Sequence, residues 1–105
     1  MLSTRLNKIL EYVNKDDLVA DIGTDHGYLL DECIKKGIKF AQGVENKKGP
    51  YQRALLTLQP HIDNNLLTLS LSDGLDDLDD RIDTVVIAGM GGELISQIID
   101  ANIEK

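Results

Sequence analysis

The chain has 105 residues, a length that suits one small domain, and its 42% hydrophobic content is enough for a single core. Its 11 Lys and Arg against 18 Asp and Glu give a formal net charge of -7, which disfavours nucleic-acid binding by this chain alone. The single cysteine, Cys33, excludes a disulfide within the chain, and its apolar helical neighbours predict burial.

Two further classes are disfavoured by the sequence. No apolar run is long enough to cross a membrane, and the first residues lack the apolar core of a signal peptide. No spacing of His, Cys and carboxylates indicates a metal site. We therefore expect a soluble cytoplasmic protein without a metal.

The first half of the chain alternates helical and strand patterns. Apolar residues recur at helical spacing from Leu2 to Val13, which predicts a helix that covers a sheet. A short strand is expected over 17–22, followed by a helix over 28–36 that Gly37 ends. A second strand is expected over 39–45.

The second half continues this alternation. A helix is expected from about Pro50 to Gln59, and Pro60 should end it because proline has no N–H to continue the hydrogen bonding. His61 is then expected in a surface turn. Strands are expected over 66–71 and 82–88, the latter almost continuously apolar as buried parallel strands are. A last helix is expected to follow, with the apolar residues Leu94, Ile95, Ile98 and Ile99.

Four strands separated by crossovers predict an α/β, Rossmann-like, doubly wound parallel sheet. Right-handed crossovers place the strands in the order 3-2-1-4. The fourth strand then lies at an edge, where so apolar a strand invites association. We therefore expect a sheet truncated after the fourth strand and its helix, with the missing neighbour supplied by a longer protein or by a second copy in a homodimer.

The first strand runs into a loop with two glycines. Gly23 and Gly27 permit a tight turn after Asp21, and the following helix points its free N–H groups into the same space, as in a nucleotide pocket. The spacing is not the G-x-G-x-x-G of dinucleotide-binding loops, and Asp25 would repel a pyrophosphate. A zwitterionic or sulfonium ligand fits better, and a turn that serves only packing is the alternative.

Acidic residues follow the second and third strands. Glu45 lies 18 positions after Gly27, close to the spacing at which an acid accepts both ribose hydroxyls, although a solvated turn acid is the alternative. Asp73, next to Gly74, is placed to accept a hydrogen bond from an adenine amino group, or else to cap a turn.

Three glycines follow the fourth strand within four residues. Gly89, Gly91 and Gly92 remove side chains where a flat substrate or the reactive group of a cofactor must pass. Met90 lies between them. It is expected either to cover a base as an apolar lid or to pack in the core.

Together these segments resemble the TrmK family, the bacterial methyltransferases that modify N1 of adenine 22 in tRNA. The resemblance spans essentially the whole chain. It is carried by Arg5-Leu6, the run Ala20-Asp21-Ile22-Gly23-Thr24-Asp25-His26-Gly27-Tyr28-Leu29, Gly49-Pro50, Asp73-Gly74-Leu75 and the run Ile87-Ala88-Gly89-Met90-Gly91-Gly92-Glu93-Leu94-Ile95.

The resemblance implies a class I fold that binds S-adenosylmethionine, with tRNA as the substrate. Asp21, Gly23 and Gly27 are implied around the methionine part of the cofactor, Glu45 on the ribose and Asp73 near the adenine. The full implied cofactor-binding set is Asp21, Gly23, Thr24, Gly27, Glu45, Asn46, Asp73, Gly74 and Gly89. Family members continue into further strands and a C-terminal helical domain that helps to grip tRNA, so residues 1–105 are expected to be the cofactor-binding domain without these parts.

Methyl transfer to adenine N1 needs positioning more than acid–base help, because the ring nitrogen already carries a lone pair. The product is positively charged, so a carboxylate near the adenine amino group would stabilise the transition state and could then accept a proton. Asp25 is the first candidate and His26 the second, although both could be turn residues. Met90, Gly91 and Gly92 are expected to receive an adenine that has left its stack.

Two other functions stay open. One is half of a nicotinamide-dependent oxidoreductase, against which the missing third glycine and Asp25 both count. The other is a fragment without catalytic activity that associates through its exposed fourth strand.

Overall fold

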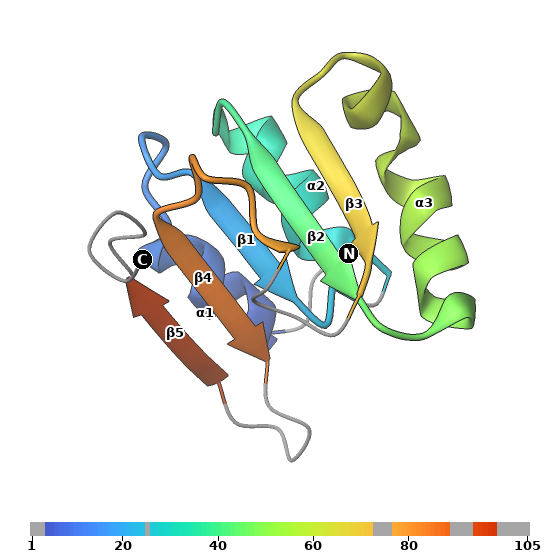
Figure 1. The fold of residues 1–105 in the computed structure, drawn as a ribbon. Coiled ribbons are helices and arrows are strands. Elements are labelled where there is room, and N and C mark those ends of the chain that lie inside the picture. Colours follow the sequence, from blue (N-terminus) through green and yellow to red (C-terminus); the bar gives the residue numbers. More distant parts are fainter. Residues whose placement is uncertain (1–3, 25, 73–76, 89–93, 99–105) are drawn as a thin grey trace.

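A computed structural model describes residues 4–24, 26–72, 77–88 and 94–98, which form one α/β unit (Figure 1). Four strands run parallel in the order β3-β2-β1-β4, as the sequence predicts. They are β1 (Val19–Ile22), β2 (Ala41–Glu45), β3 (Leu67–Leu71) and β4 (Thr84–Ala88). The Rossmann-like fold class is thereby confirmed.

A fifth strand, β5 (Leu94–Ile98), replaces the helix that was expected after β4. It runs antiparallel to β4, with Ala88 opposite Leu94 and Thr84 opposite Ile98. Strand pairing satisfies the outer backbone groups of apolar β4, which a helix would leave open, and the isoleucines of this segment favour extended backbone. The edge through which a homodimer was expected is therefore paired within the chain.

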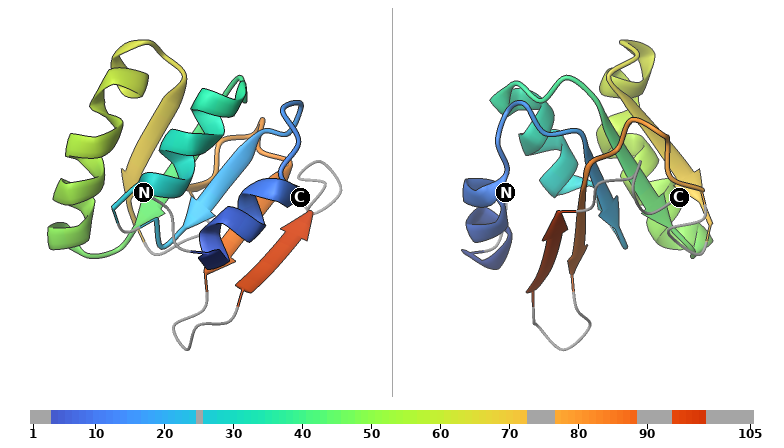
Figure 2. Two further views of the ribbon diagram at one scale, coloured as in Figure 1. Left: turned by 180° about the vertical axis from the view of Figure 1, so that it is seen from behind. Right: turned by 60° about the vertical axis from the view of Figure 1, so that its left-hand side comes forward.

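In the described part of the chain, three helices lie on one face of the sheet, seen from behind in the left view of Figure 2. They are α1 (Thr4–Tyr12), α2 (Tyr28–Lys36) and α3 (Lys48–Asp63). One core cluster joins Ile9 of α1, Leu30 of α2 and Leu58 of α3 to the strands. Cys33 is fully buried in this cluster, as expected.

The opposite face of β1 and β4 is covered by residues 77–83, which lead into β4 and cross the front of the sheet in Figure 1. Leu78 and Ile82 of this segment contact Ala20 and Val85 in a second, smaller apolar cluster.

The structure confirms α2 with the predicted bounds. Gly37 follows it with a φ of +115°. The N–H of Gly37 donates to the carbonyl of Ile34 and the N–H of Ile38 to the carbonyl of Cys33, so the glycine ends the helix as expected.

Helix α3 does not end at Pro60, as was expected, but continues to Asp63. Proline removes one hydrogen bond, to the carbonyl of Leu56, and Leu56 lies on the solvent side with 82% of its surface exposed, where water can replace that bond. Packing holds the last turn in place. Ile62 contacts the main core, and His61 contacts Asp31 of α2 at 2.7 Å. The prediction that His61 lies in a surface turn is therefore wrong.

Candidate cofactor site at the carboxyl ends of the strands

The carboxyl ends of β1, β2 and β3 meet at one edge of the sheet and are tied together by backbone hydrogen bonds. The N–H of Gly23, just after β1, donates to the carbonyl of Val44 at 2.8 Å. The N–H of Ser72, just after β3, donates to the carbonyl of Glu45 at 2.9 Å. These bonds bring the first three predicted strand ends into one site.

Among the described carboxyl groups at this edge, Asp21 has the largest shift in pKa. It is only 4% exposed, and burial raises its pKa to about 7. The Thr24 side chain acts to lower the pKa of Asp21, and the charge of Glu45 acts to raise it. The Thr24 hydroxyl makes no hydrogen bond of ordinary geometry. A buried acid of this kind stays partly neutral near pH 7 and favours a cationic ligand that would hold it ionised.

Glu45 closes β2 and is 7% exposed. Its Oε2 accepts hydrogen bonds from the N–H groups of Asn46 at 3.1 Å and Lys47 at 3.3 Å. These bonds fix the carboxylate where β2 turns into α3. The structure therefore brings Asp21 and Glu45 to the same edge, as predicted.

The two glycines of the first loop have different surroundings, although both adopt positive φ. A Cβ on Gly23, at φ +74°, would meet no atom within 4 Å, so open space lies beside this residue. A Cβ on Gly27, at φ +80°, would lie 2.9 Å from the side chain of buried Leu58. The observed role of Gly27 is thus to let α2 pack closely against α3.

A hollow of about 100 Å³ lies between these strand ends, lined by Ile22, Gly23, Val44, Asn46 and Ser72. Among the described residues, two buried side-chain oxygens make no hydrogen bond, the hydroxyls of Ser72 and Thr24. Buried hydroxyls are normally paired, so their position beside Gly23 and the hollow indicates a polar ligand. Ser72 was not among the predicted site residues. Its place directly after β3 was the available signal.

A larger groove, of about 540 Å³, lies at the free side of β3 and is lined in part by Tyr51, Leu55 and Leu69. Its described lining includes none of the predicted site residues and no carboxylate. We therefore place the candidate site at the strand ends, where the Asp21 and Glu45 carboxyls and the Ser72 hydroxyl lie, rather than in the larger groove.

His26 and Tyr28 lie at the start of α2, with their rings stacked at a centroid distance of 5.2 Å and an interplanar angle of 9°. The remaining predicted residues lie outside the part of the chain that the structure describes. They are Asp25, Asp73, Gly74, Gly89, Met90, Gly91 and Gly92.

Two features are absent from the part of the chain that the structure describes. None of the helices there combines the length and apolarity that a membrane crossing requires. Nor do the described residues contain a group of three or more His, Cys, Asp or Glu side chains arranged to hold a metal ion.

Comparisons with known proteins agree with this geometry. The profile of the methyltransferase domain family matches residues 2–105. The tRNA (adenine(22)-N(1))-methyltransferase of Bacillus subtilis strain 168 is 34% identical over 108 residues, covering 99% of this chain and 44% of that protein. The chain therefore belongs to the methyltransferase domain family.

Solved structures place the chain more closely within that family. A Streptococcus pneumoniae protein described as a candidate tRNA (m1A22) methyltransferase, in complex with S-adenosyl-L-methionine, is 31% identical with a TM-score of 0.78, covering 86% of this chain and 44% of that one. M. capricolum TrmK in complex with S-adenosyl-homocysteine is 30% identical with a TM-score of 0.73, covering 85% and 42%. The chain is a class I methyltransferase domain homologous to the tRNA m1A22 methyltransferases, and it spans less than half of the length of these relatives.

Proposed function

We propose that this chain binds S-adenosylmethionine and serves methyl transfer to N1 of adenine 22 in tRNA. The observation that carries the proposal is the placement of two buried carboxyls, Asp21 and Glu45, at the edge of the sheet that also holds the unpaired Ser72 hydroxyl. The solved relatives with bound S-adenosyl-L-methionine or S-adenosyl-homocysteine support the same assignment.

The residues present suit such a ligand. An ionised Asp21 attracts the ammonium and sulfonium charges of the methionine part, and these charges in turn favour its ionised form. Glu45, oriented by two backbone N–H groups, accepts hydrogen bonds from the ribose hydroxyls. Gly23 leaves room for close approach of the ligand to the backbone.

The other cofactor contacts are assigned from the family resemblance. Asp73 accepts from the adenine amino group, beside Gly74. The remaining cofactor-binding residues are Thr24, Gly27, Asn46 and Gly89. When bound, S-adenosylmethionine supplies a methyl group on a good, neutral leaving group.

This chain's own catalytic contribution is positioning and charge. We assign to Asp25 the stabilisation of the positive charge on the methylated target adenine and the acceptance of a proton from it, with His26 as the second candidate. Met90, Gly91 and Gly92 receive the target base. The chain spans 44% of the length of the Bacillus subtilis relative. We propose that tRNA binding also requires regions that correspond to the rest of that relative.

Calorimetric titrations with S-adenosylhomocysteine and with NADH test the cofactor class. We expect heat of binding with S-adenosylhomocysteine and none with NADH. Binding of NADH alone would favour the nicotinamide-dependent oxidoreductase and contradict the proposal.

The substrate is tested by transfer of a radiolabelled methyl group to unmodified tRNA, using this chain and a version lengthened to the size of its relatives. We expect label on adenine 22 with the lengthened version. Label on another nucleotide, or none with either protein, would contradict the substrate assignment. Light scattering tests the remaining alternative, a fragment without catalytic activity that associates with itself. A monomer at high concentration would speak against that alternative.

A further inference from the structure

The segment 46–62, which leads from β2 through most of α3, contains no acidic residue. It carries three positively charged residues in a chain whose formal net charge is -7. They are Lys47, Lys48 and Arg53, all of which are exposed, and we call them the basic patch. Protein surfaces usually mix both signs of charge, so a patch of one sign in an acidic chain is a candidate surface for an anionic partner.

The three residues of the basic patch lie close together. Lys47 directly precedes α3, and Lys48 is its first residue. The Arg53 guanidinium reaches back along the helix, so that its Nη1 would lie 3.6 Å from a Cβ placed on Gly49. Because Gly49 directly follows Lys48, all three cationic residues belong to one small area of the surface.

Neighbouring acids do not neutralise the two lysines of the basic patch. In the described ranges, no carboxylate forms an ion pair with Lys47 or Lys48. Lys35 of α2, by contrast, pairs with Asp31 at 3.0 Å. The charges of Lys47 and Lys48 therefore stay available to a partner.

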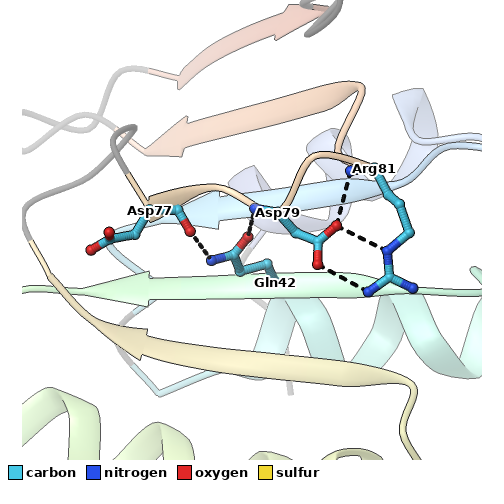
Figure 3. A network of polar contacts seen from close by, with 4 residues as sticks. All are labelled: Gln42, Asp77, Asp79 and Arg81. Carbon is cyan, nitrogen blue, oxygen red and sulfur yellow. Dashed lines mark hydrogen bonds and ion pairs between the residues drawn. The ribbon is translucent and has the colours of Figure 1, made fainter.

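Arg81, in the segment that covers the opposite face of the sheet, is neutralised within the chain (Figure 3). Its guanidinium bonds the Asp79 carboxylate through Nε at 2.9 Å and Nη2 at 3.0 Å. Gln42 of β2 holds the same segment, since it accepts from the N–H of Asp79 at 2.7 Å and donates to the carbonyl of Asp77 at 2.8 Å. This cation is thus less suited to an external anion than the lysines of the basic patch.

The basic patch borders the candidate cofactor site. The N–H of Lys47 donates to Glu45 Oε2 at 3.3 Å, and Asn46 lines the hollow at the strand ends. Helix α3 begins beside the carboxyl end of β2 (Figure 1). An RNA that delivers a base to this site is much larger than the site and must also lie over neighbouring surface, where its phosphates would meet exposed cations.

We infer that Lys47, Lys48 and Arg53 bind the phosphate backbone of the tRNA substrate beside the cofactor site. The inference rests on the proposed function, because it assumes that a tRNA is methylated there. Phosphate contacts position a nucleic acid without reading its bases, so the basic patch should govern affinity and its dependence on salt. S-adenosylmethionine carries no phosphate and does not require these side-chain charges.

Fluorescence anisotropy with labelled, unmodified tRNA measures the affinity of this chain between about 50 and 200 mM salt. We expect Lys48→Gln/Arg53→Gln to weaken binding by about tenfold at the lowest salt and to reduce the slope of log Kd against log salt by about 1–2. Lys15→Gln/Lys39→Gln is the matched control, because it removes the same charge from exposed residues near the amino ends of β1 and β2. It should weaken binding by less than about threefold.

A charge-conserving variant separates charge from structure. Lys48→Arg/Arg53→Lys should keep the affinity for tRNA within about threefold of the original, because phosphates are attracted by the charge of either side chain. A loss as large as that of Lys48→Gln/Arg53→Gln would show a structural role and overturn the inference. An equal fall in the affinity of Lys48→Gln/Arg53→Gln for S-adenosylhomocysteine would do the same.

The remaining outcomes are also decisive. An equal loss in the matched control would show dependence on net charge alone and overturn the inference. Absence of tRNA binding by the unaltered chain would overturn it too. If S-adenosylhomocysteine still binds in that case, the proposed function stands and tRNA is held elsewhere. If neither ligand binds, the proposed function fails as well.

Acetylation of lysines, followed by mass spectrometry, tests the contact without any substitution. With saturating tRNA, Lys47 and Lys48 should react more slowly by about threefold or more, because bound phosphates cover them. Lys15 and Lys39 should keep their rates. Equal protection of all four lysines, or protection of none, would overturn the inference.

Discussion

The Asp21 and Glu45 carboxyls lie at neighbouring strand ends, and the charge of Glu45 adds to the effect of burial in raising the pKa of Asp21. Two acids so close in a buried place destabilise the ligand-free protein once both are ionised. We interpret this repulsion as a preference for a cationic ligand, because a positive charge between the carboxylates would relieve it.

Replacing Asp21 by Asn should therefore change the pH dependence of stability. The pKa of Asp21 is raised to about 7 in the folded chain from 3.8, so the folded state binds the extra proton between these values and stability falls as pH rises through this window. Asp21→Asn should remove that fall and stabilise the ligand-free chain at pH 8 by on the order of 2 kcal/mol. Urea unfolding at pH 5 and pH 8 measures it. An identical loss of stability with pH in both proteins would show that Asp21 is not the group that titrates.

The two loop glycines should respond differently to alanine. Gly27→Ala combines positive φ with a contact at 2.9 Å to Leu58, and should cost about 2–4 kcal/mol of the free energy of unfolding. Gly23→Ala meets open space, so only the positive φ costs, about 1 kcal/mol, while the new methyl group should weaken S-adenosylhomocysteine binding. Denaturant unfolding and calorimetry separate the two effects. Equal losses of stability would contradict the different surroundings seen here.

The unpaired Ser72 hydroxyl should matter to the ligand and not to the fold. Ser72→Ala removes a buried oxygen that has no partner, so the unfolding free energy should change by less than about 1 kcal/mol. The affinity for S-adenosylhomocysteine should fall by about fivefold, the equivalent of one hydrogen bond. Leu71→Ala, one residue earlier on an exposed side chain, is the control. Unchanged affinity in Ser72→Ala would remove this hydroxyl from the site.

Asp31 should contribute stability that increases as pH rises, whereas the contribution of Asp21 decreases. Burial acts to raise the pKa of Asp31, but hydrogen bonds to His61 and Lys35 outweigh it and hold the pKa below its ordinary value. The stabilisation is therefore present above the unfolded pKa and is lost as pH falls through the lower folded value. Asp31→Asn should cost about 1 kcal/mol at pH 7 and less at pH 3.

Glu32→Gln is the matched control for Asp31→Asn. Glu32 lies 3.8 Å from the same Lys35 but is more exposed, so the change should have almost no effect on stability. A similar effect of the two substitutions would contradict the specific role of the His61 contact.

Much of the fold follows from patterns within single segments. Apolar strands between helical patterns predicted the parallel order around β1, and Gly37 predicted the end of α2. The same reasoning placed Asp21 and Glu45 at one edge, because the carboxyl ends of parallel strands meet there.

What the sequence did not predict depends on contacts between distant segments. Helix α3 passes Pro60 because Ile62 packs in the core, which no local rule contains. The strand β5 forms because it pairs with β4, although its apolar spacing also suits a helix. Gln42 has no motif around it, since its partners at 77 and 79 are backbone groups distant in sequence.

The most direct test of the cofactor site is a crystal structure of this chain with S-adenosylhomocysteine. We predict the ligand at the carboxyl ends of β1, β2 and β3, with its ammonium near Asp21, its ribose hydroxyls on Glu45 and a hydrogen bond to Ser72. A ligand bound instead in the groove between α3 and β3, away from both carboxylates, would contradict the account.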